Sequence, residues 1–313
     1  MTRRRIGAAA SNDKSDVRVH RESGHSPMPT TPPGGAGRPS CAGTKRNSGD
    51  PALAVPGILL HAMFRDRTVS LVIPAYNEEE TIAQVVEEFR QQPDLDEIVV
   101  VDNNCKDQTA ERAAAAGARV VSETAPGYGA ALTAGMNAAK GELLVLVEAD
   151  GSFRAKDVVK LLCYLEDAGM VMGTRTTKQM VEQGANMRFL LRWGNVFMAK
   201  FLQLCWMRPS EPRFTDVGCT FRALTRETWL QIRARTREPG PAFSPEMMCA
   251  ALQARCRVIE VPVSYGNRMG GESKHSDTFR RQATLAWKMF RTICRKRFLE
   301  RGAPLPSPEV RGA

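Results

Sequence analysis

Two acidic residues flank one small residue at Glu148-Ala149-Asp150, directly after an apolar run. A turn at that point can aim both carboxylates at one place, where they repel each other unless a cation or a proton neutralises them. Mg²⁺ is usually held by one or two carboxylates together with phosphates of a substrate. The triplet therefore predicts a divalent-metal site for a phosphate-bearing substrate, although a solvated acidic loop has the same kind of sequence.

Other polar residues also stand where apolar runs end. Pro74 ends the first run, and Glu78 opens a helical pattern, where the helix dipole favours an acid. The polar residues that follow the runs are Asn77 and Glu78, Asp102 and Asn103, Glu148 and Asp150, and Thr174 and Arg175. If the runs are neighbouring strands of a parallel sheet, these residues lie together, because ligands bind beyond the carboxyl ends of such strands.

The elements that must position these residues alternate regularly. Short runs of Val, Ile and Leu indicate strands, and apolar residues at helical spacing indicate the helices between them. Strands are expected at 68–73, 97–101, 118–121, 142–147 and 170–173, and helices at 78–90, 107–116, 128–140 and 156–167. Continuous apolar strands joined by single helices indicate a sheet covered on both faces. The predicted fold is α/β, with a Rossmann-like, mostly parallel central sheet.

The net charge of +10 is concentrated at the two ends of the chain. Residues 1–67 contain 11 Lys or Arg against 5 Asp or Glu, and residues 274–313 contain 10 against 3, so the centre is slightly acidic. This distribution argues against a nucleic-acid-binding core and suits ends that contact phosphates or lipid headgroups. Eight cysteines without a C-x-x-C pair in a long chain indicate reduced thiols in the cytoplasm.

The composition divides the chain into three segments. Residues 1–64 are rich in Pro, Gly, Ser and Arg and are expected to form a disordered leader. Met63 is an alternative start, so the sequence leaves open whether residues 1–62 are translated. A globular domain is expected at 65–276, followed by a basic amphipathic helix and tail at 277–313.

Several short motifs occur in order within that globular domain. The run 72–79 reads V-I-P-A-Y-N-E-E, the run 97–102 reads E-I-V-V-V-D, and the run 148–151 reads E-A-D-G. Together they resemble the opening segment, second strand and acid-x-acid metal motif of family-2 glycosyltransferases with the GT-A fold. Other segments resemble the branch of this family that loads sugars onto polyprenyl phosphates, which includes dolichyl-phosphate mannosyltransferases. These segments are 127–132, 173–175, 216–219 and the pair Arg268 and Lys274.

The resemblance implies a metal-dependent, inverting hexosyltransferase that uses Mg²⁺ or Mn²⁺. Its nucleotide-sugar site would contain Pro74, Tyr76, Glu78, Val100, Asp102, Glu148, Ala149, Asp150, Arg268 and Lys274. Glu148 and Asp150 would bind the metal, and Val100 and Asp102 would hold the base or ribose. The catalytic groups would be Asp150, Arg175, Arg268 and Lys274, with the last two reaching the phosphates from a late glycine-containing loop.

Three positions depart from the family pattern. Glu148 stands where the family usually has Asp, which lengthens one metal ligand. Asn103-Asn104-Cys105 replaces the usual Asp-Gly-Ser, so the identity of the base stays open between UDP-glucose and GDP-mannose as donors. Ser152 stands where related enzymes often have Gln, and it is not assigned to the metal.

The resemblance implies a polyprenyl or dolichyl phosphate as acceptor. A phosphate monoester is largely dianionic at pH 7 and needs no strong base to become a nucleophile. A hydroxyl acceptor would need a carboxylate or His as general base, and Asp216 and Glu246 are the candidates. The alternative is therefore the same fold and donor chemistry with a soluble glycan or small-molecule acceptor.

Two segments, 189–207 and 279–299, carry apolar stripes among basic residues and are typical of helices that lie in a bilayer interface. They predict a peripheral protein on the cytoplasmic face of a membrane, although a core helix and a solvated end helix would have similar patterns. The sequence leaves open the choice of Mg²⁺ or Mn²⁺ and whether the chain forms a homo-oligomer.

A dinucleotide-binding dehydrogenase is a weaker interpretation. Gly127-Tyr128-Gly129 is followed by an acid about 20 residues later, as that fingerprint requires. However, Leu132 occupies the third glycine position, and the first strand is not followed by a glycine loop. A binding module without activity would tolerate loss of Asp150, which this sequence retains.

Overall fold

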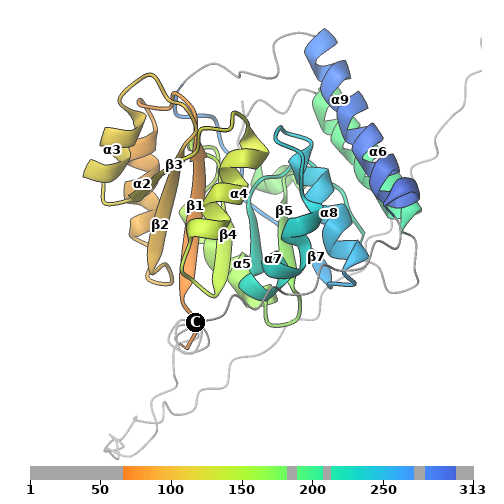
Figure 1. Cartoon of the computed structure of the whole chain (residues 1–313), viewed down its shortest axis with the longest axis horizontal. Coiled ribbons are helices and arrows are strands. Elements are labelled where there is room, and N and C mark those ends of the chain that lie inside the picture. Colours follow the sequence, from red (N-terminus) through yellow and green to blue (C-terminus); the bar gives the residue numbers. More distant parts are fainter. Residues whose placement is uncertain (1–65, 182–188, 207–212, 271–278, 301–313) are drawn as a thin grey trace, which may run out of the picture. The chain divides into compact units, whose positions relative to one another are not determined.

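A seven-stranded sheet forms the centre of the computed structural model, which describes residues 66–181, 189–206, 213–270 and 279–300 (Figure 1). The strands are β1 (Val69–Ala75), β2 (Glu97–Asp102), β3 (Arg119–Ser122), β4 (Leu143–Leu146), β5 (Met170–Thr174), β6 (Arg222–Thr225) and β7 (Val258–Pro262). Their order is β3-β2-β1-β4-β6-β5-β7, and only β6 runs antiparallel to its neighbours. The prediction of a mostly parallel sheet is confirmed.

The strands are apolar throughout because both faces of the sheet are covered. In β1, Leu71 and Ile73 pack into one core cluster, whereas Val72 between them packs into the other. Successive side chains of a strand point to opposite faces, so a strand buried on both sides must be apolar at every position. The two clusters are therefore the two faces of one sheet.

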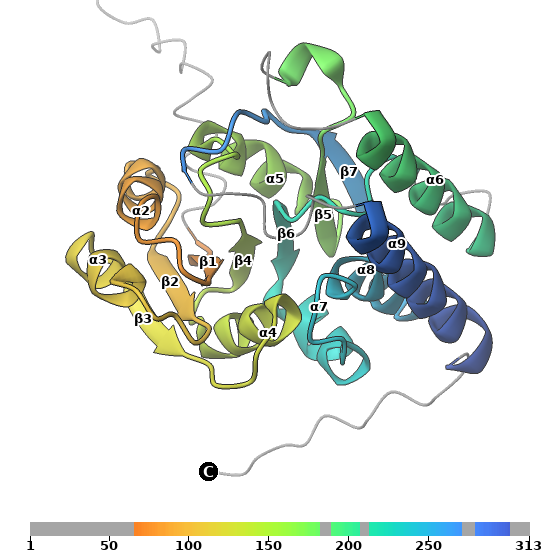
Figure 2. The ribbon, with the colours of Figure 1, turned by 90° about the horizontal axis from the view of Figure 1, so that it is seen from above.

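Helices lie against both faces, as Figure 2 shows from above. The helices α2 (Ile82–Arg90), α3 (Thr109–Ala115) and α5 (Val158–Tyr164) contribute buried residues to the first cluster. The second cluster includes residues of α4 (Tyr128–Ala138), α6 (Phe189–Cys205), α7 (Arg226–Ile232), α8 (Phe243–Gln253) and α9 (Phe279–Cys294). Short helical turns are η1 (Ala155–Asp157), η2 (Lys178–Met180), η3 (Arg233–Arg235) and the π-helical η4 (Arg295–Leu299). None of the described helices is long and apolar enough to cross a membrane.

The carboxyl ends of β1, β2 and β4 lie side by side, since β1 pairs in parallel with the other two. The turns that follow these strands therefore meet at one edge of the sheet. The expected strands and helices of this part agree with the structure to within a few residues at each boundary.

The last helix belongs to the packed fold. Met289 and Ile293 of α9 are buried in the second core cluster, and Phe290 packs on Phe201 of α6 with ring centroids 4.8 Å apart. The expected leader at 1–64 and the expected boundary between residues 276 and 277 fall outside the described residues. The segment 279–299 is helical, in agreement with the prediction for it.

Candidate active site

A pocket of about 540 Å³ opens at the edge where β1, β2 and β4 end. This volume is in the range of sites that bind small molecules of nucleotide size. Its lining includes seven of the residues that the sequence predicted for the nucleotide sugar: Pro74, Tyr76, Glu78, Glu148, Ala149, Asp150 and Arg268. The pocket also contains residues that the sequence analysis did not assign: Asn103, Asn104, Lys106, Thr124, Pro126, Tyr128, Gly240 and Pro241.

The two acids after β4 carry unfavourable negative charge. Asp150 is buried, and Glu148 is partly buried at the pocket wall. Burial and the neighbouring charge of Asp150 raise the pKa of Glu148 to about 7. Two carboxylates in this position are stable together when a proton or a cation neutralises one of them.

Asp150 is held by two different contacts. Its Oδ1 accepts hydrogen bonds from the backbone N–H of Ser152 at 2.9 Å and from the Ser152 hydroxyl at 2.6 Å. Its other oxygen, Oδ2, accepts no hydrogen bond from the described residues and lies 3.1 Å from Nε of Arg268. Ser152 thus orients the carboxylate, and Oδ2 is turned toward a cationic partner in the pocket.

The loop 238–242 contributes Gly240 and Pro241 to the pocket lining. The backbone carbonyl of Pro239 accepts a hydrogen bond of 2.7 Å from the N–H of Gly129, in the first turn of α4. A Cβ at Gly129 would lie 2.1 Å from the carbonyl oxygen of Glu238. Glycine is required there because the loop and the helix approach each other through their backbones.

Two residues predicted to hold the base or ribose do not line the pocket. The Val100 side chain is fully buried in the first core cluster, because alternate residues of β2 face opposite sides of the sheet. The Asp102 carboxylate accepts a hydrogen bond of 2.8 Å from the N–H of Cys105 and closes the turn after β2. The neighbouring Asn103 and Asn104, rather than Val100 and Asp102, border the pocket.

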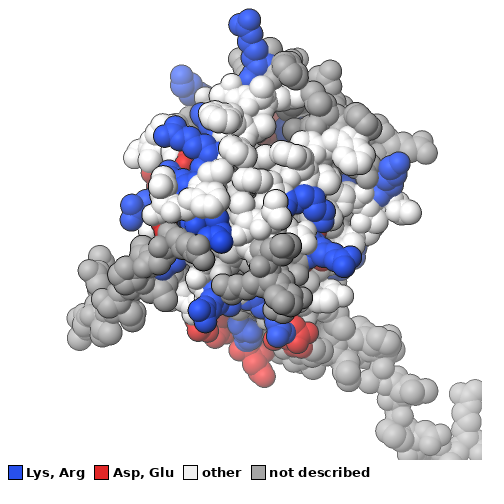
Figure 3. Space-filling model, turned by 90° about the vertical axis from the view of Figure 1, so that its right-hand side faces the viewer, with Lys and Arg blue, Asp and Glu red and all other residues white. Residues whose placement is uncertain are grey.

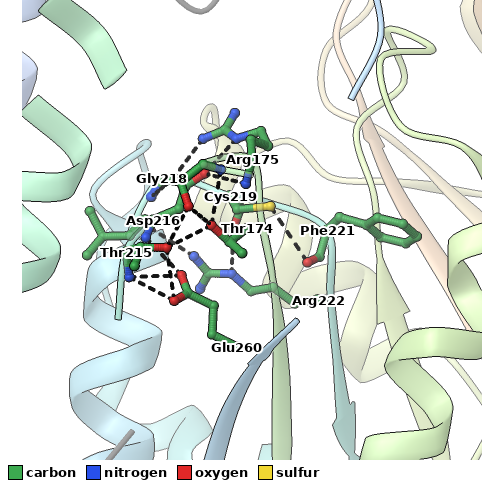
Figure 4. A network of polar contacts seen from close by, with 11 residues as sticks. Thr174, Arg175, Thr215, Asp216, Gly218, Cys219, Phe221, Arg222 and Glu260 are labelled. Atoms are coloured by element: carbon green, nitrogen blue, oxygen red, sulfur yellow. Dashed lines mark hydrogen bonds and ion pairs between the residues drawn. The ribbon is translucent and has the colours of Figure 1, made fainter. Parts of the chain in front are cut away.

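Arg175 and Asp216 form a buried, bidentate ion pair (Figure 4). Nε and Nη2 of Arg175 lie 2.8 and 3.0 Å from the two carboxylate oxygens of Asp216. Glu260 of β7 supports the pair by accepting hydrogen bonds from the backbone N–H groups of Thr215 and Asp216, both at 2.8 Å. Burial raises the pKa of Glu260 to about 7, although these hydrogen bonds favour its ionised form.

The Arg175 guanidinium lies close enough to the acid pair for its charge to lower the pKa of Glu148, against the effects of burial and Asp150. It also lies over the Tyr265 ring, 5.3 Å from the centroid. Arg175 is not part of the pocket lining itself. Its position is fixed by Asp216, so these two predicted residues act as one unit.

Glu246 is fully buried in α8 and is surrounded by donors. Its carboxylate accepts hydrogen bonds of 2.7 Å from the backbone N–H groups of Arg237 and Glu238, and it pairs with Arg295 at 2.9 Å and Lys296 at 3.2 Å. The predicted acceptor role of Glu246 does not agree with this position, because Glu246 is fully buried and does not line the pocket. Lys274, predicted to contact the phosphates, lies outside the described residues.

Comparisons with known proteins agree with this architecture. Residues 70–223 match the sequence model of glycosyl transferase family 2. An uncharacterised glycosyltransferase of Mycobacterium tuberculosis is 36% identical over 213 residues, which cover 68% of this chain and 91% of the relative. A dolichyl-phosphate β-glucosyltransferase of Trichomonas vaginalis is 26% identical over 229 residues, covering 66% and 68%.

Among solved structures, the chain is similar to glucosyl-3-phosphoglycerate synthase of Mycobacterium tuberculosis. That structure has a TM-score of 0.59 and 21% identity, covers 80% of this chain and 86% of its own, and contains Mn²⁺, UDP and glucosyl-3-phosphoglycerate. Another structure of the same enzyme contains Mg²⁺ and UDP. The chain belongs to glycosyl transferase family 2 and has the GT-A fold, so the predicted family, fold and enzymatic class are confirmed.

Proposed function

We propose that this glycosyltransferase moves a hexose, with inversion, from a nucleotide sugar to a polyprenyl phosphate at the cytoplasmic face of a membrane. The donor is UDP-glucose or GDP-mannose, and the cofactor is Mg²⁺ or Mn²⁺. The pocket at the carboxyl ends of β1, β2 and β4 supports the donor assignment by its volume and by the charged side chains of Glu148, Asp150 and Arg268 in its lining. UDP in structures of the similar synthase supports the same assignment.

The acid pair fits a divalent cation. Asp150 Oδ2 is buried without a hydrogen-bond donor, and the raised pKa of Glu148 means that a second negative charge is unfavourable there. The described residues include no group of three His, Cys, Asp or Glu side chains that could hold a metal alone. Two carboxylates completed by donor phosphates are the usual arrangement for Mg²⁺. When bound, the cation would offset the charge that develops on the departing diphosphate.

Cationic side chains of the protein would also stabilise the charge that develops on the departing diphosphate. Arg268 lines the pocket beside Asp150 and is positioned to contact the donor phosphates, and Lys274 is proposed to contact them as well. An acceptor oxygen would attack the anomeric carbon while the bond to the diphosphate oxygen breaks on the opposite side. Fixed cations that face the leaving group stabilise that transition state without reorganising. Arg175 is proposed to attract the acceptor phosphate toward the acid pair.

The observation that carries the acceptor assignment is the state of the two candidate bases. Asp216 is paired with Arg175 through both oxygens, and Glu246 is paired with Arg295 and Lys296. Both are fully buried, and neither lines the pocket. Among the described residues, these two are thus unsuited to remove a proton from a hydroxyl. A phosphate acceptor needs no such base, since it is already largely dianionic at pH 7.

A surface formed by α6, α9 and η4 supports a membrane location. Trp193, Phe197 and Leu204 of α6 are more than half exposed, as are Trp287 of α9 and Phe298 of η4. Figure 3 shows this side of the molecule, where Lys and Arg side chains surround an area without charged residues and the acidic side chains in view gather mainly at the lower edge. Apolar stripes edged with cations are typical of helices that lie in an anionic bilayer interface.

The test is a radiolabelled transfer assay with the purified chain. UDP-glucose and GDP-mannose are each offered with Mg²⁺ or Mn²⁺, together with a short polyprenyl phosphate, with 3-phosphoglycerate, or with no acceptor. Label that enters the organic phase with one donor, and no longer does so after chelation, supports the proposal and identifies the sugar. Label that enters only phosphoglycerate would overturn the lipid acceptor and favour the soluble one used by the structurally similar synthase.

A further inference from the structure

A second pocket of about 320 Å³ lies between α9 and the loop 238–242. It is separate from the donor pocket, and none of the residues predicted for metal, donor or acceptor lines it. Its lining consists of Glu238, Pro239, Gly240, Pro241, Ala242, Lys288, Arg291, Thr292 and Arg295. Three of these residues are cationic: Lys288 and Arg291 of α9 and Arg295 at the start of η4. Their spacing of three and four residues places them on one side of the helix.

The charges of this pocket are unevenly paired. Glu238 Oε1 lies 3.0 Å from Nη2 of Arg295 and accepts a hydrogen bond of 3.2 Å from the Thr292 hydroxyl. The only acid in the lining is therefore paired with Arg295, which also lies 2.9 Å from Glu246 and 3.2 Å from Glu300. Lys288 and Arg291 are exposed, and neither forms an ion pair with any described residue. Lys288 and Arg291 thus line a concave space without a carboxylate partner among the described residues. The one carboxylate of that lining, Glu238, contacts Arg295 and Thr292 instead.

The space between these cations and the loop is open to a ligand. A Cβ at Gly240 would meet no atom within 4 Å, so the backbone there leaves room at the pocket wall. A guanidinium offers several N–H donors in a plane, and an ammonium offers a compact charge with three donors. Together they match the several oxygens and the double negative charge of a phosphate group better than a single carboxylate.

We propose that this second pocket binds a phosphate group, with Lys288 and Arg291 as its two cationic contacts. The phosphate belongs to a lipid headgroup or to a free phosphate ion, and the experiment below distinguishes the two sources. The site is independent of which sugar acceptor the enzyme uses. Trp287, next to Lys288 in the chain, is exposed and would lie near the headgroups of a bilayer.

The position of the pocket gives its ligand a route to the donor site. Gly240 and Pro241 line both pockets, so one short loop separates the two. That loop is held on the donor side by the hydrogen bond from Gly129 N–H to Pro239, and on the other side by Glu246, which accepts from Glu238 N–H. A ligand that binds against the loop is expected to restrict its movement and to strengthen nucleotide binding several-fold.

The test compares the double variant Lys288→Ala/Arg291→Ala with the wild type. Lys140→Ala/Lys156→Ala is the control, because it removes two exposed cations that line neither pocket. Binding of inorganic phosphate is measured by calorimetry with the donor pocket filled by UDP and Mn²⁺. Binding of phosphatidylcholine vesicles, with and without phosphatidic acid, is measured by co-sedimentation. Melting temperatures confirm that both variants are folded.

We expect the α9 variant to bind at least tenfold more weakly than the wild type, and the control to bind like the wild type. Loss of inorganic phosphate binding would identify a free-phosphate site, and loss confined to vesicles with phosphatidic acid would identify a headgroup site. Equal binding by the α9 variant and the wild type, or no binding of either probe to the wild type, would overturn the proposal. Neither readout involves sugar transfer, so failure of the proposed function would not change the result.

Discussion

At the scale of single residues, the candidate site depends on how a few charges are compensated. Asp150 is the residue on which most of the proposed chemistry converges, because it faces Arg268 and lies next to Glu148. Its Oδ1 accepts hydrogen bonds from Ser152, so removal of its charge mainly affects Oδ2, which is turned toward Arg268.

Asp150→Asn is expected to reduce sugar transfer by roughly 10²–10³-fold, because Arg268 loses its counter-charge and the proposed metal site loses one of its two carboxylates. Asparagine has nearly the same shape and can still accept from Ser152, so the melting temperature should change little. Initial transfer rates and thermal unfolding measure the two effects. Ser152→Ala is the comparison and should reduce transfer less. Full activity of Asp150→Asn would contradict the assignment of the metal site.

Glu260 provides a prediction about pH. Burial raises its pKa in the folded protein to about 7, whereas the unfolded chain has a value near 4.5. The unfolded chain therefore loses this proton first, and the stability that Glu260 contributes is present below pH 4.5 and is lost as the pH rises to about 7. Urea unfolding at pH 5 and pH 8 should show a larger loss of stability for the wild type than for Glu260→Gln. The same pH dependence in both proteins would contradict the shift.

At the scale of elements, the sequence predicts β1 to β5, because each of these strands is a short apolar run and a helical pattern separates it from the next run. The strand β6 was not predicted, since it has four residues and begins with Arg222. That guanidinium is fully buried and donates to the carbonyls of Cys219, Ser244 and Val217. A buried arginine in a strand is not indicated by an apolar run, so the hydrophobic pattern does not reveal this strand.

Some residues of the pocket could also be predicted from the local sequence, and others could not. Residues that follow β1 and β4 could be predicted because a parallel sheet places strand ends together. Gly240 and Pro241 could not, because they reach the pocket through contact with α4, which lies more than 100 residues earlier in the chain. Val100 lies in the core cluster and not in the pocket lining, because a motif match does not tell which face of a strand a residue occupies.

The contact between α4 and the loop 238–242 can be tested with two glycines. Gly129→Ala places a Cβ 2.1 Å from the Glu238 carbonyl oxygen, so the loop must move. We expect a loss of roughly 1–3 kcal/mol in stability, as is usual for overpacking, and weaker UDP binding. Gly194→Ala in α6 is the control, since its Cβ would meet nothing within 4 Å and should stabilise the helix by about 0.5–1 kcal/mol. Unaltered UDP binding by Gly129→Ala would show that the loop does not shape the donor pocket.

Glu246 joins α8 to the end of α9, which gives a second prediction for this scale. Glu246→Gln removes the charge that faces Arg295 and the fully buried Lys296. Arg295 keeps Glu238 and Lys296 keeps Glu300, so the expected loss of stability is smaller than the roughly 3–5 kcal/mol of a buried pair that loses its only partner. Denaturant unfolding measures it. A base for a hydroxyl acceptor would instead give a stable variant with a much lower kcat, and that result would contradict the structural role.

At the scale of the whole molecule, the question is whether the side that carries α6 and α9 meets a membrane. Deleting residues 279–313 is not a clean test, because it would also remove Met289 and Ile293 from the core. Substitution of exposed side chains alone leaves the packing in place. Trp193 and Phe197 of α6 and Trp287 of α9 are suitable, since each is more than half exposed.

The variant Trp193→Ala/Phe197→Ala/Trp287→Ala is expected to bind anionic vesicles at least fivefold more weakly than the wild type, because buried aromatic area drives insertion into the interface. Tyr164→Ala/Leu230→Ala is the matched control, since it removes exposed apolar side chains from α5 and α7 and should bind like the wild type. Raising the salt concentration should weaken binding of both further, because Lys and Arg on this side attract anionic headgroups. Transfer to a water-soluble short-chain polyprenyl phosphate should change little in the triple variant, whereas transfer to acceptor embedded in vesicles should fall with binding. Equal vesicle binding by the triple variant and the wild type would mean that these helices face another partner, and the enzyme would then reach its acceptor without docking through this side.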